Sequence, residues 1–206
     1  MRRHRLGVPI LAGVVVAAVL ITVFVLDPFG ERVRAAVDGT SNGTGAEAAA
    51  VDLDALPDWM KTELVDAASG ETFAIANFIG RPILIESFAV WCSICLRQQK
   101  EMARLIELEG EAIVHVSLDT DPNEDLDKVE DHIERHGFTW YYAVAPIEMT
   151  QLLIVDFGLS VVNAPLAPVV LVDVDGSARL LDRGVKTAEA LLEEIGPLST
   201  TAGAEG

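Results

Sequence analysis

The sequence predicts an α/β fold over residues 53–197, a three-layer sandwich whose mixed sheet has helices on both faces. Three observations support this expectation. Apolar segments of strand length alternate with helical patterns from residue 81 to residue 158, which favours parallel strands covered by helices. One hairpin signal precedes this alternation and another follows it, and these add antiparallel strands. Half of the residues are hydrophobic, so the chain can bury a sizeable core.

The first half of this domain places a strand and a helix on either side of two cysteines. Residues 62–78 hold two short apolar pieces around Ser69-Gly70, which indicates a hairpin. The run RPILIESFAV, residues 81–90, is almost continuously apolar, as expected for a central buried strand. From residue 93 to residue 109, apolar side chains recur at helical spacing, namely Ile94, Met102, Leu105 and Ile106.

The second half continues the alternation and closes it with a hairpin and a helix. Strand candidates occupy residues 111–118 and 138–144, and helix candidates occupy residues 122–136 and 148–158. Gly137 is the expected stop of the first of these helices. Asp175-Gly176 lies inside an alternating run and signals a two-residue hairpin turn. A last helix is expected to begin after Thr187 as its N-cap and to stop at Gly196.

The N-terminal segment predicts a membrane anchor. Its first five residues contain three arginines, and residues 7–26 contain no charged residue. At about 1.5 Å per residue this apolar run spans the roughly 30 Å hydrocarbon core. It is longer than the apolar region of a cleaved signal peptide, about 7 to 15 residues. We therefore expect residues 1–27 to form a transmembrane helix, with removal as a signal peptide as the alternative. The arginines favour an N-terminus inside the membrane, which leaves the following domain extracytoplasmic.

Composition sets the remaining boundaries and excludes one class of partner. Residues 28–52 are expected to be a flexible linker, because the stretch GTSNGTGAEAAA is small and polar without periodicity. Residues 198–206 are expected to be a disordered tail. The chain has 15 basic and 32 acidic residues, a formal net charge of −17. This balance argues against nucleic acid as a partner, because phosphate binding relies on clustered Lys and Arg.

Cys92 and Cys95, the only cysteines of the chain, stand at the predicted junction of strand and helix. Structural zinc normally takes four ligands, and the histidines do not show the spacing of a zinc finger. A structural disulfide across so short a loop would constrain the unfolded chain little. The helix N-terminus favours a thiolate at Cys92, and Cys95, one turn deeper, is placed to resolve a mixed disulfide. The pair therefore indicates redox chemistry.

Two residues before the pair are candidates for the same site. Glu86 lies in the predicted strand, six residues before Cys92 and on the same face. Burial should raise its pKa, which is what a general base near neutral pH needs. The alternative is a partly exposed strand residue without a role. Trp91 is expected to shield the cysteines and to meet the partner, with aromatic core packing as the alternative.

The segment ILIESFAVWCSIC, residues 83–95, followed by an amphipathic helix, resembles the active-site region of thioredoxin-fold proteins. With the N-terminal anchor and the early hairpin, the chain resembles the membrane-anchored, extracytoplasmic thioredoxin-like reductases of the cytochrome c maturation type. The resemblance implies a thioredoxin-like sandwich with a redox-active CxxC centre, and a role in cell redox homeostasis. It implies protein disulfide or dithiol substrates, an electron donor of unknown identity, and no cofactor. It also suggests that Glu86 handles the proton of Cys95.

The resemblance further implies a cis-proline that faces the cysteines. Pro168 fits this position because it leads directly into the strand of the last hairpin, and Pro165 is the rival. The family usually has a β-branched residue before this proline, where this chain has Ala167, and it has a proline in the active-site helix that residues 96–110 lack. The expected substrate-binding surface comprises Trp91, Ser93, Ile94, Ala167 and Pro168.

The residues between the cysteines bear on the direction of electron flow. Ser93-Ile94 between the cysteines contains no histidine that could stabilise the thiolate, which favours a reductase over a strong oxidant. The alternative function is a tethered binding or chaperone module whose disulfide is structural.

Two sequence patterns, one of acidic residues and one of histidines, resemble metal sites. Residues 119–130 match several positions of a calcium loop, but Glu124 stands where that loop needs glycine. Asp121 and Pro122 are better explained as a helix N-cap and first turn. His132 and His136 are four residues apart and are expected to be solvated on a helix. We therefore predict no metal.

Overall fold

The computed structural model describes residues 51–196. The predicted anchor at residues 1–27, most of the predicted linker at residues 28–52, and the predicted tail at residues 198–206 lie outside the described residues. Among residues 51–196, no helix is both long enough and apolar enough to span a membrane.

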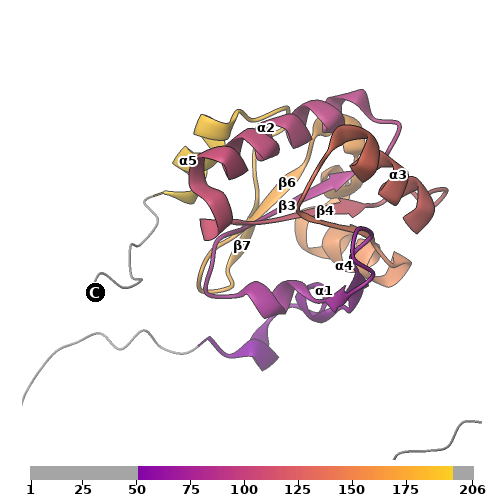
Figure 1. Ribbon diagram of the computed structural model, residues 1–206. Helices are drawn as coiled ribbons and strands as arrows, with labels where there is room; N and C mark the ends of the chain where they lie inside the picture. The colour runs from indigo at the N-terminus through magenta and orange to yellow at the C-terminus, as the bar shows by residue number, and fades with distance from the viewer. Residues whose placement is uncertain (1–50, 197–206) are drawn as a thin grey trace, which may run out of the picture. The chain divides into compact units, whose positions relative to one another are not determined.

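A five-stranded mixed sheet organises the domain, with strand order β5-β4-β3-β6-β7 (Figure 1). The strands are β3 (Ile83–Phe88), β4 (Val114–Asp119), β5 (Tyr141–Val144), β6 (Val169–Val172) and β7 (Ala178–Leu180). β3 pairs in parallel with β4, and β4 with β5, as the alternation of strands and helices predicted. β6 runs antiparallel to both β3 and β7, so the last hairpin closes one side of the sheet. The predicted mixed sheet is confirmed.

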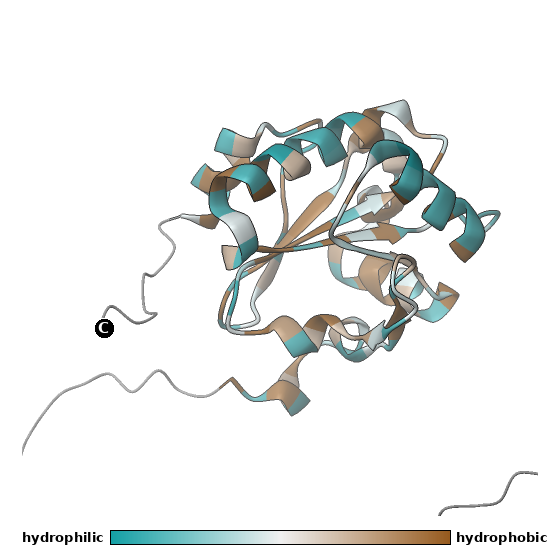
Figure 2. Ribbon diagram, viewed as in Figure 1, coloured by the Kyte–Doolittle hydropathy of each residue, from teal (hydrophilic) through white to brown (hydrophobic). Residues whose placement is uncertain are grey.

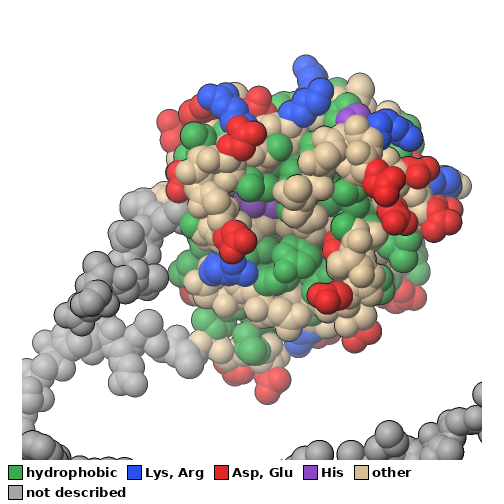
Figure 3. All heavy atoms as spheres, in the orientation of Figure 1, with side chains coloured by type: hydrophobic (Ala, Val, Ile, Leu, Met, Phe, Trp, Pro, Cys, Tyr) green, Lys and Arg blue, Asp and Glu red, His purple; other side chains and the backbone are tan. Residues whose placement is uncertain are grey.

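Helices cover both faces of this sheet, which confirms the three layers (Figure 1). On one face lie α2 (Ser93–Glu109), α3 (Leu126–His136) and α5 (Ala188–Ile195), and on the other lie α1 (Asp58–Lys61) and α4 (Ile147–Phe157). Figure 2 shows hydrophobic strands in the middle and hydrophilic outer surfaces on α2 and α3. On the face drawn in Figure 3, acidic side chains gather over α3. Burial of the two sheet faces therefore holds the fold together.

Strand β3 lies at the centre, and each of its residues is buried. Leu84 and Phe88 belong to the core beneath α2, whereas Ile83 and Ile85 belong to the core on the opposite face. Because side chains alternate along a strand, Glu86 points to the α2 face, together with Leu84 and Phe88. The strand that carries Glu86 also ends where α2 begins.

The predicted early hairpin is present as β1 (Leu64–Val65) and β2 (Thr72–Phe73), a separate antiparallel pair. The main-chain N–H of Ala67 donates to the carbonyl of Tyr142 at 2.7 Å. This bond ties the hairpin to the edge strand β5.

Several short elements were not predicted. They are α1 and the 3-10 helices η1 (Leu53–Ala55), η2 (Ile75–Phe78), η3 (Gly110–Ala112), η4 (Leu159–Val162) and η5 (Ala164–Leu166). Segments of three or four residues complete at most about one helical turn, so they cannot show an apolar period.

Helix α3 starts four residues later than predicted. Asp125 is the N-cap, and its carboxylate accepts the main-chain N–H of Lys128 at 3.1 Å. Asp121, the predicted cap, accepts the N–H of Asn123 and the indole N–H of Trp91 instead. The carboxylate of Asp121 therefore stabilises the preceding turn. The other predicted helix limits, Gly137, Thr187 and Gly196, are confirmed as caps.

Candidate active site

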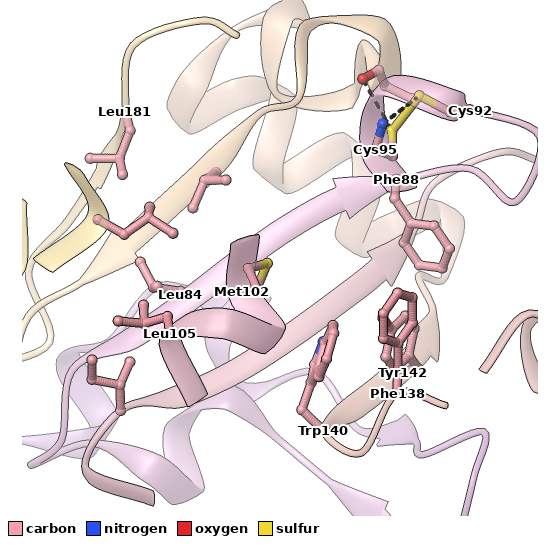
Figure 4. Close-up of a cluster of buried hydrophobic side chains, with 14 of the residues drawn as sticks. Leu84, Phe88, Cys92, Cys95, Met102, Leu105, Phe138, Trp140, Tyr142 and Leu181 are labelled. Atoms are coloured by element: carbon pink, nitrogen blue, oxygen red, sulfur yellow. Dashed lines mark hydrogen bonds between the residues drawn. A yellow bond between two sulfur atoms is a disulfide. The ribbon is translucent and has the colours of Figure 1, made fainter. Parts of the chain in front are cut away.

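The two cysteines form a disulfide at the N-terminus of α2 (Figure 4). Phe88 ends β3, and the chain turns so that the N–H of Cys92 donates to the carbonyl of Ala89 at 3.0 Å. Cys92 then caps α2, and its Sγ accepts the N–H of Cys95 at 3.1 Å. A helix N-terminus that donates to sulfur stabilises negative charge there. The predicted position of Cys92 is confirmed.

Both sulfur-bearing side chains are nearly enclosed in the disulfide form. Cys92 is 4% exposed and Cys95 is 1% exposed. Cys92, the outer of the two, is therefore also buried while the disulfide is closed. Ser93 is exposed and Ile94 is half-buried against the core under α2.

A cavity of about 430 Å³ lies beside the residues that precede Cys92. Its lining consists of Ala89, Trp91, Thr120, Asp121, Pro122, Leu159, Val162, Asn163, Ala164 and Pro165. The carbonyl oxygen of Ala164 lies 3.2 Å from Cys95 Sγ, so the cavity wall touches the inner cysteine. Of the predicted substrate-binding residues, only Trp91 lines this cavity.

Trp91 is 63% exposed, so it is not core packing. Its indole N–H donates to a carboxylate oxygen of Asp121 at 2.6 Å. The next acidic residue of the same loop, Glu124, accepts the main-chain N–H of Val90 at 2.7 Å. Two carboxylates after β4 thus hold the loop that leads into Cys92. Asp119, at the end of β4, is fully buried, and desolvation raises the pKa of its carboxyl to about 8.

Glu86 is fully buried, as predicted. Ser117 on β4 donates to Glu86 Oε2 at 3.3 Å, whereas Oε1 has no hydrogen-bond partner. Desolvation raises the pKa of Glu86 to about 8, and Gln99, Ser117 and Lys186 each act in the opposite direction. Its carboxyl therefore changes protonation near neutral pH, on the α2 face of the sheet.

The buried polar residues around Glu86 come from three elements. Trp140 donates its indole N–H to Ser117 Oγ at 3.0 Å, so the hydroxyl that bonds Glu86 is itself held. Gln99 lies one helical turn after Cys95 on the buried side of α2, and its Oε1 is 2.8 Å from His132 Nε2. His132 is buried, so the expectation of a solvated histidine is wrong. Burial lowers the pKa of His132 to about 4.

Neither a protein-family model nor a curated protein sequence matches this chain. Several solved structures do match it. One is a secreted Mycobacterium tuberculosis disulfide oxidoreductase described as homologous to E. coli DsbE, with a TM-score of 0.54 and 13% identity. That match covers 67% of this chain and 96% of the other.

Two further structures agree with this match. A thiol:disulfide interchange protein of the thioredoxin family from Chlorobium tepidum TLS has a TM-score of 0.52 and 16% identity, over 63% of this chain and 87% of its own. An Aquifex aeolicus VF5 protein described as a putative electron transfer protein has a TM-score of 0.55 and 17% identity, over 66% and 88%. This chain has the thioredoxin fold.

One expectation drawn from the thioredoxin fold is wrong here. Every peptide bond among residues 51–196 is trans, so neither Pro168 nor Pro165 is a cis-proline. The chain turns instead through η5 and then through Ala167, whose φ of 45° is the left-handed conformation. Ala167 and Pro168 are buried behind the turn, while Pro165 lies on the cavity wall.

Three residues of this thioredoxin-fold site were missed from the sequence. Gln98 and Gln99 are fully buried on α2, yet glutamine is normally a surface residue of a helix. Lys186 lies in the loop before α5, far from the cysteines in sequence. A pair of adjacent glutamines one turn after a CxxC was a usable signal for the first two. Nothing local in the sequence indicated Lys186.

Proposed function

We propose that this protein is a thiol–disulfide oxidoreductase whose Cys92–Cys95 pair reduces disulfides in other proteins. The observation that carries the proposal is the disulfide at the N-terminus of α2, with Cys92 as helix cap and Cys95 behind it. Several proteins with a similar fold are described as disulfide oxidoreductases or thiol:disulfide interchange proteins, which supports the same reading.

In the proposed reaction the reduced Cys92 thiolate attacks one sulfur of a substrate disulfide. A mixed disulfide forms, and the other substrate sulfur leaves as a thiolate that takes up a proton. Cys95 then loses its proton and attacks the Cys92 sulfur, which releases the second substrate thiol and closes the Cys92–Cys95 disulfide. Two electrons pass from the pair to the substrate. A separate dithiol donor returns two electrons to the pair.

Glu86 is the proposed base for the second step. Its carboxyl is buried on the face of the sheet that α2 covers, in the same layer as Cys95. Its pKa of about 8 allows it to accept a proton near neutral pH and to release it again. The absence of histidine between the cysteines, at Ser93-Ile94, favours the reducing direction.

We further propose that residues 1–27 tether the domain to a membrane with its active site on the outer side. The uncharged run of residues 7–26 and the arginines before it support this placement. Protein disulfides outside the membrane are then the substrate class, and the electron donor is a membrane-associated dithiol.

The decisive experiment uses single cysteine variants of the full chain in detergent. Cys95→Ser should attack a disulfide-containing peptide and accumulate as a mixed disulfide, visible by mass spectrometry. Cys92→Ser, the matched control, should form no such adduct. Equilibration of the unmodified pair with glutathione buffers gives its reduction potential and tests the reducing direction. A pair that never exchanges would contradict the proposal and favour a binding module with a structural disulfide.

A further inference from the structure

Lys186 is a partly buried lysine that contacts the active-site helix and the turn beside it. Its ammonium donates to the carbonyl oxygen of Ala167 at 2.8 Å and to that of Gly184 at 2.6 Å. An ammonium with two carbonyl partners in a partly buried position is more restricted than that of a lysine on an open surface. Burial lowers the pKa of Lys186 to about 8, while Glu86, Asp182 and Glu194 counter that lowering.

The main chain of Lys186 is also attached to α2. Its N–H donates to Gln98 Oε1 at 2.7 Å, and its carbonyl accepts from Gln98 Nε2 at 3.1 Å. The amide oxygen and the amide nitrogen of the fully buried Gln98 thus both bond to the main chain of Lys186. Gln98 lies three residues after Cys95, so Lys186 is held directly against the active-site helix.

The carbonyl that Lys186 holds belongs to the turn that touches Cys95. Ala167 follows η5, and the first residue of η5, Ala164, has its carbonyl 3.2 Å from Cys95 Sγ. Ala167 also lies two residues before Val169, which pairs directly with Glu86 across β6 and β3. The hydrogen bonds of Lys186 therefore bring its positive charge to the strand pair that carries Glu86.

We propose that Lys186 is a positioning residue of this active site. Its ammonium fixes the turn at residues 164–168 against α2 and supplies the positive charge opposite Glu86. The buried carboxylate then ionises more readily, and it can take the proton of Cys95 when Cys95 attacks the mixed disulfide. The charge relation between Lys186 and Glu86 stands by itself, whereas its use in the resolving step rests on the proposed function.

Few other groups can account for the ionisation of Glu86. Its neighbours on α2 and β4, Gln99 and Ser117, are uncharged. Tyr142 on β5 faces the carboxylate, and burial raises the pKa of that phenol far above neutral. Asp182, after β7, and Glu194, on α5, act on Lys186 and strengthen its protonation. Among the groups that act on Glu86, Lys186 supplies the cation.

The test measures the protonation of Glu86 directly by carbon NMR of the full chain, labelled at glutamate carboxyls and held in detergent micelles. The Glu86 signal is assigned by its loss in Glu86→Gln. The Cys92–Cys95 disulfide is kept closed, so no thiol titrates and the result does not depend on enzyme activity. Lys186→Met should raise the midpoint of Glu86 by about one pH unit, as expected when a nearby opposite charge is lost. Lys186→Arg should keep the midpoint close to that of the wild-type protein.

Lys100→Met is the matched control, because it removes the same charge from the exposed side of α2. It should leave the Glu86 midpoint unchanged. An unmoved midpoint in Lys186→Met, or an equal shift in Lys100→Met, would overturn the proposal. If Lys186→Met does not fold by circular dichroism, Lys186→Gln replaces it, because it keeps polarity without the charge. Should the shift occur in a protein that never exchanges disulfides, the proposed function fails and the charge relation remains.

Discussion

Glu86 is a carboxyl group inside a strand whose every residue is buried. Ionisation of a carboxyl group in such a place costs free energy because the charge loses its water. A functional reason for the presence of this group is therefore expected. Its position on the α2 face could be predicted from the alternation of side chains along β3. Its surroundings could not be predicted, because its partner Ser117, the indole of Trp140 that bonds Ser117, and the charge of Lys186 come from three separate segments.

Replacement of Glu86 by Gln should separate the two steps of disulfide exchange. The change keeps shape and polarity but removes the base, so resolution by Cys95 should slow by about a hundredfold or more near neutral pH. The rate of the first attack by Cys92 should remain nearly unchanged, because the helix N-terminus, and not Glu86, stabilises the Cys92 thiolate. Stopped-flow kinetics of both steps across pH provide the measurement. An equal loss in both steps would point to a structural role instead.

The predicted substrate surface agrees only in part with the positions of its residues in the structure. Trp91, which directly precedes Cys92, is exposed and lines the cavity, so the alternative of core packing is excluded. Ala167 and Pro168 were expected to face the substrate, and both are buried behind the turn. The left-handed Ala167 allows the chain to reverse with trans bonds, and a side chain in that conformation has no signature in the sequence.

The regular elements were the most predictable level. Strands β3, β4 and β6 are buried on both faces and follow from largely apolar runs, whereas helix α2 follows from the helical spacing of its buried stripe. The start of α3 was misplaced because the loop before it holds several acidic residues that can each act as a cap. Asp121 does not cap α3, because its carboxylate accepts the indole N–H of Trp91, which lies 30 residues earlier in the sequence.

Removal of the actual cap of α3 should cost measurable stability. Asp125→Ala deletes the side-chain acceptor for the N–H of Lys128, and such losses amount to about 0.5 to 2 kcal/mol. Asp131→Ala, an exposed position within the same helix, is the control for the loss of one negative charge. Urea unfolding of both variants gives the comparison. If Asp121→Ala destabilises the helix as much as Asp125→Ala does, the assigned cap is wrong.

At the scale of the whole molecule, buried ionisable groups make stability depend on pH. Glu86 and Asp119 have folded pKa values of about 8, above their ordinary values of 4.5 and 3.8. His115 and His132 have folded values of about 4, below the ordinary 6.5. Between about pH 7 and 8 the histidines are mostly neutral in both states. In that window the unfolded chain has lost the two carboxyl protons that the folded protein retains.

The free energy of unfolding should therefore fall as pH rises from about 7 to 8. Each carboxyl contributes a slope of up to about 1.4 kcal/mol per pH unit. Glu86→Gln should remove roughly half of this slope, because Asp119 remains. Urea titrations of the wild-type protein and the variant at several pH values test the sign. A flat or rising profile in the wild-type protein would show that these carboxyls ionise normally.

The thioredoxin-fold domain should fold without the N-terminal segment. Residues 51–196 contain both hydrophobic cores, so deletion of residues 1–38 removes no buried side chain of the described part. The shortened chain should be soluble, folded and able to exchange disulfides. Size-exclusion chromatography and the glutathione titration provide the measurements. Aggregation or a shifted reduction potential would mean that the domain boundary is wrong.

The exposed Trp91 gives the protein an intrinsic optical signal. Trp59 and Trp140 are 1% and 9% exposed, so only Trp91, at 63%, emits from a largely aqueous environment. It directly precedes the disulfide, and a disulfide next to an excited indole quenches its fluorescence by accepting an electron. Reduction of the pair should therefore brighten the red edge of the emission spectrum. The progress of exchange can then be followed in real time, without a dye or a second enzyme.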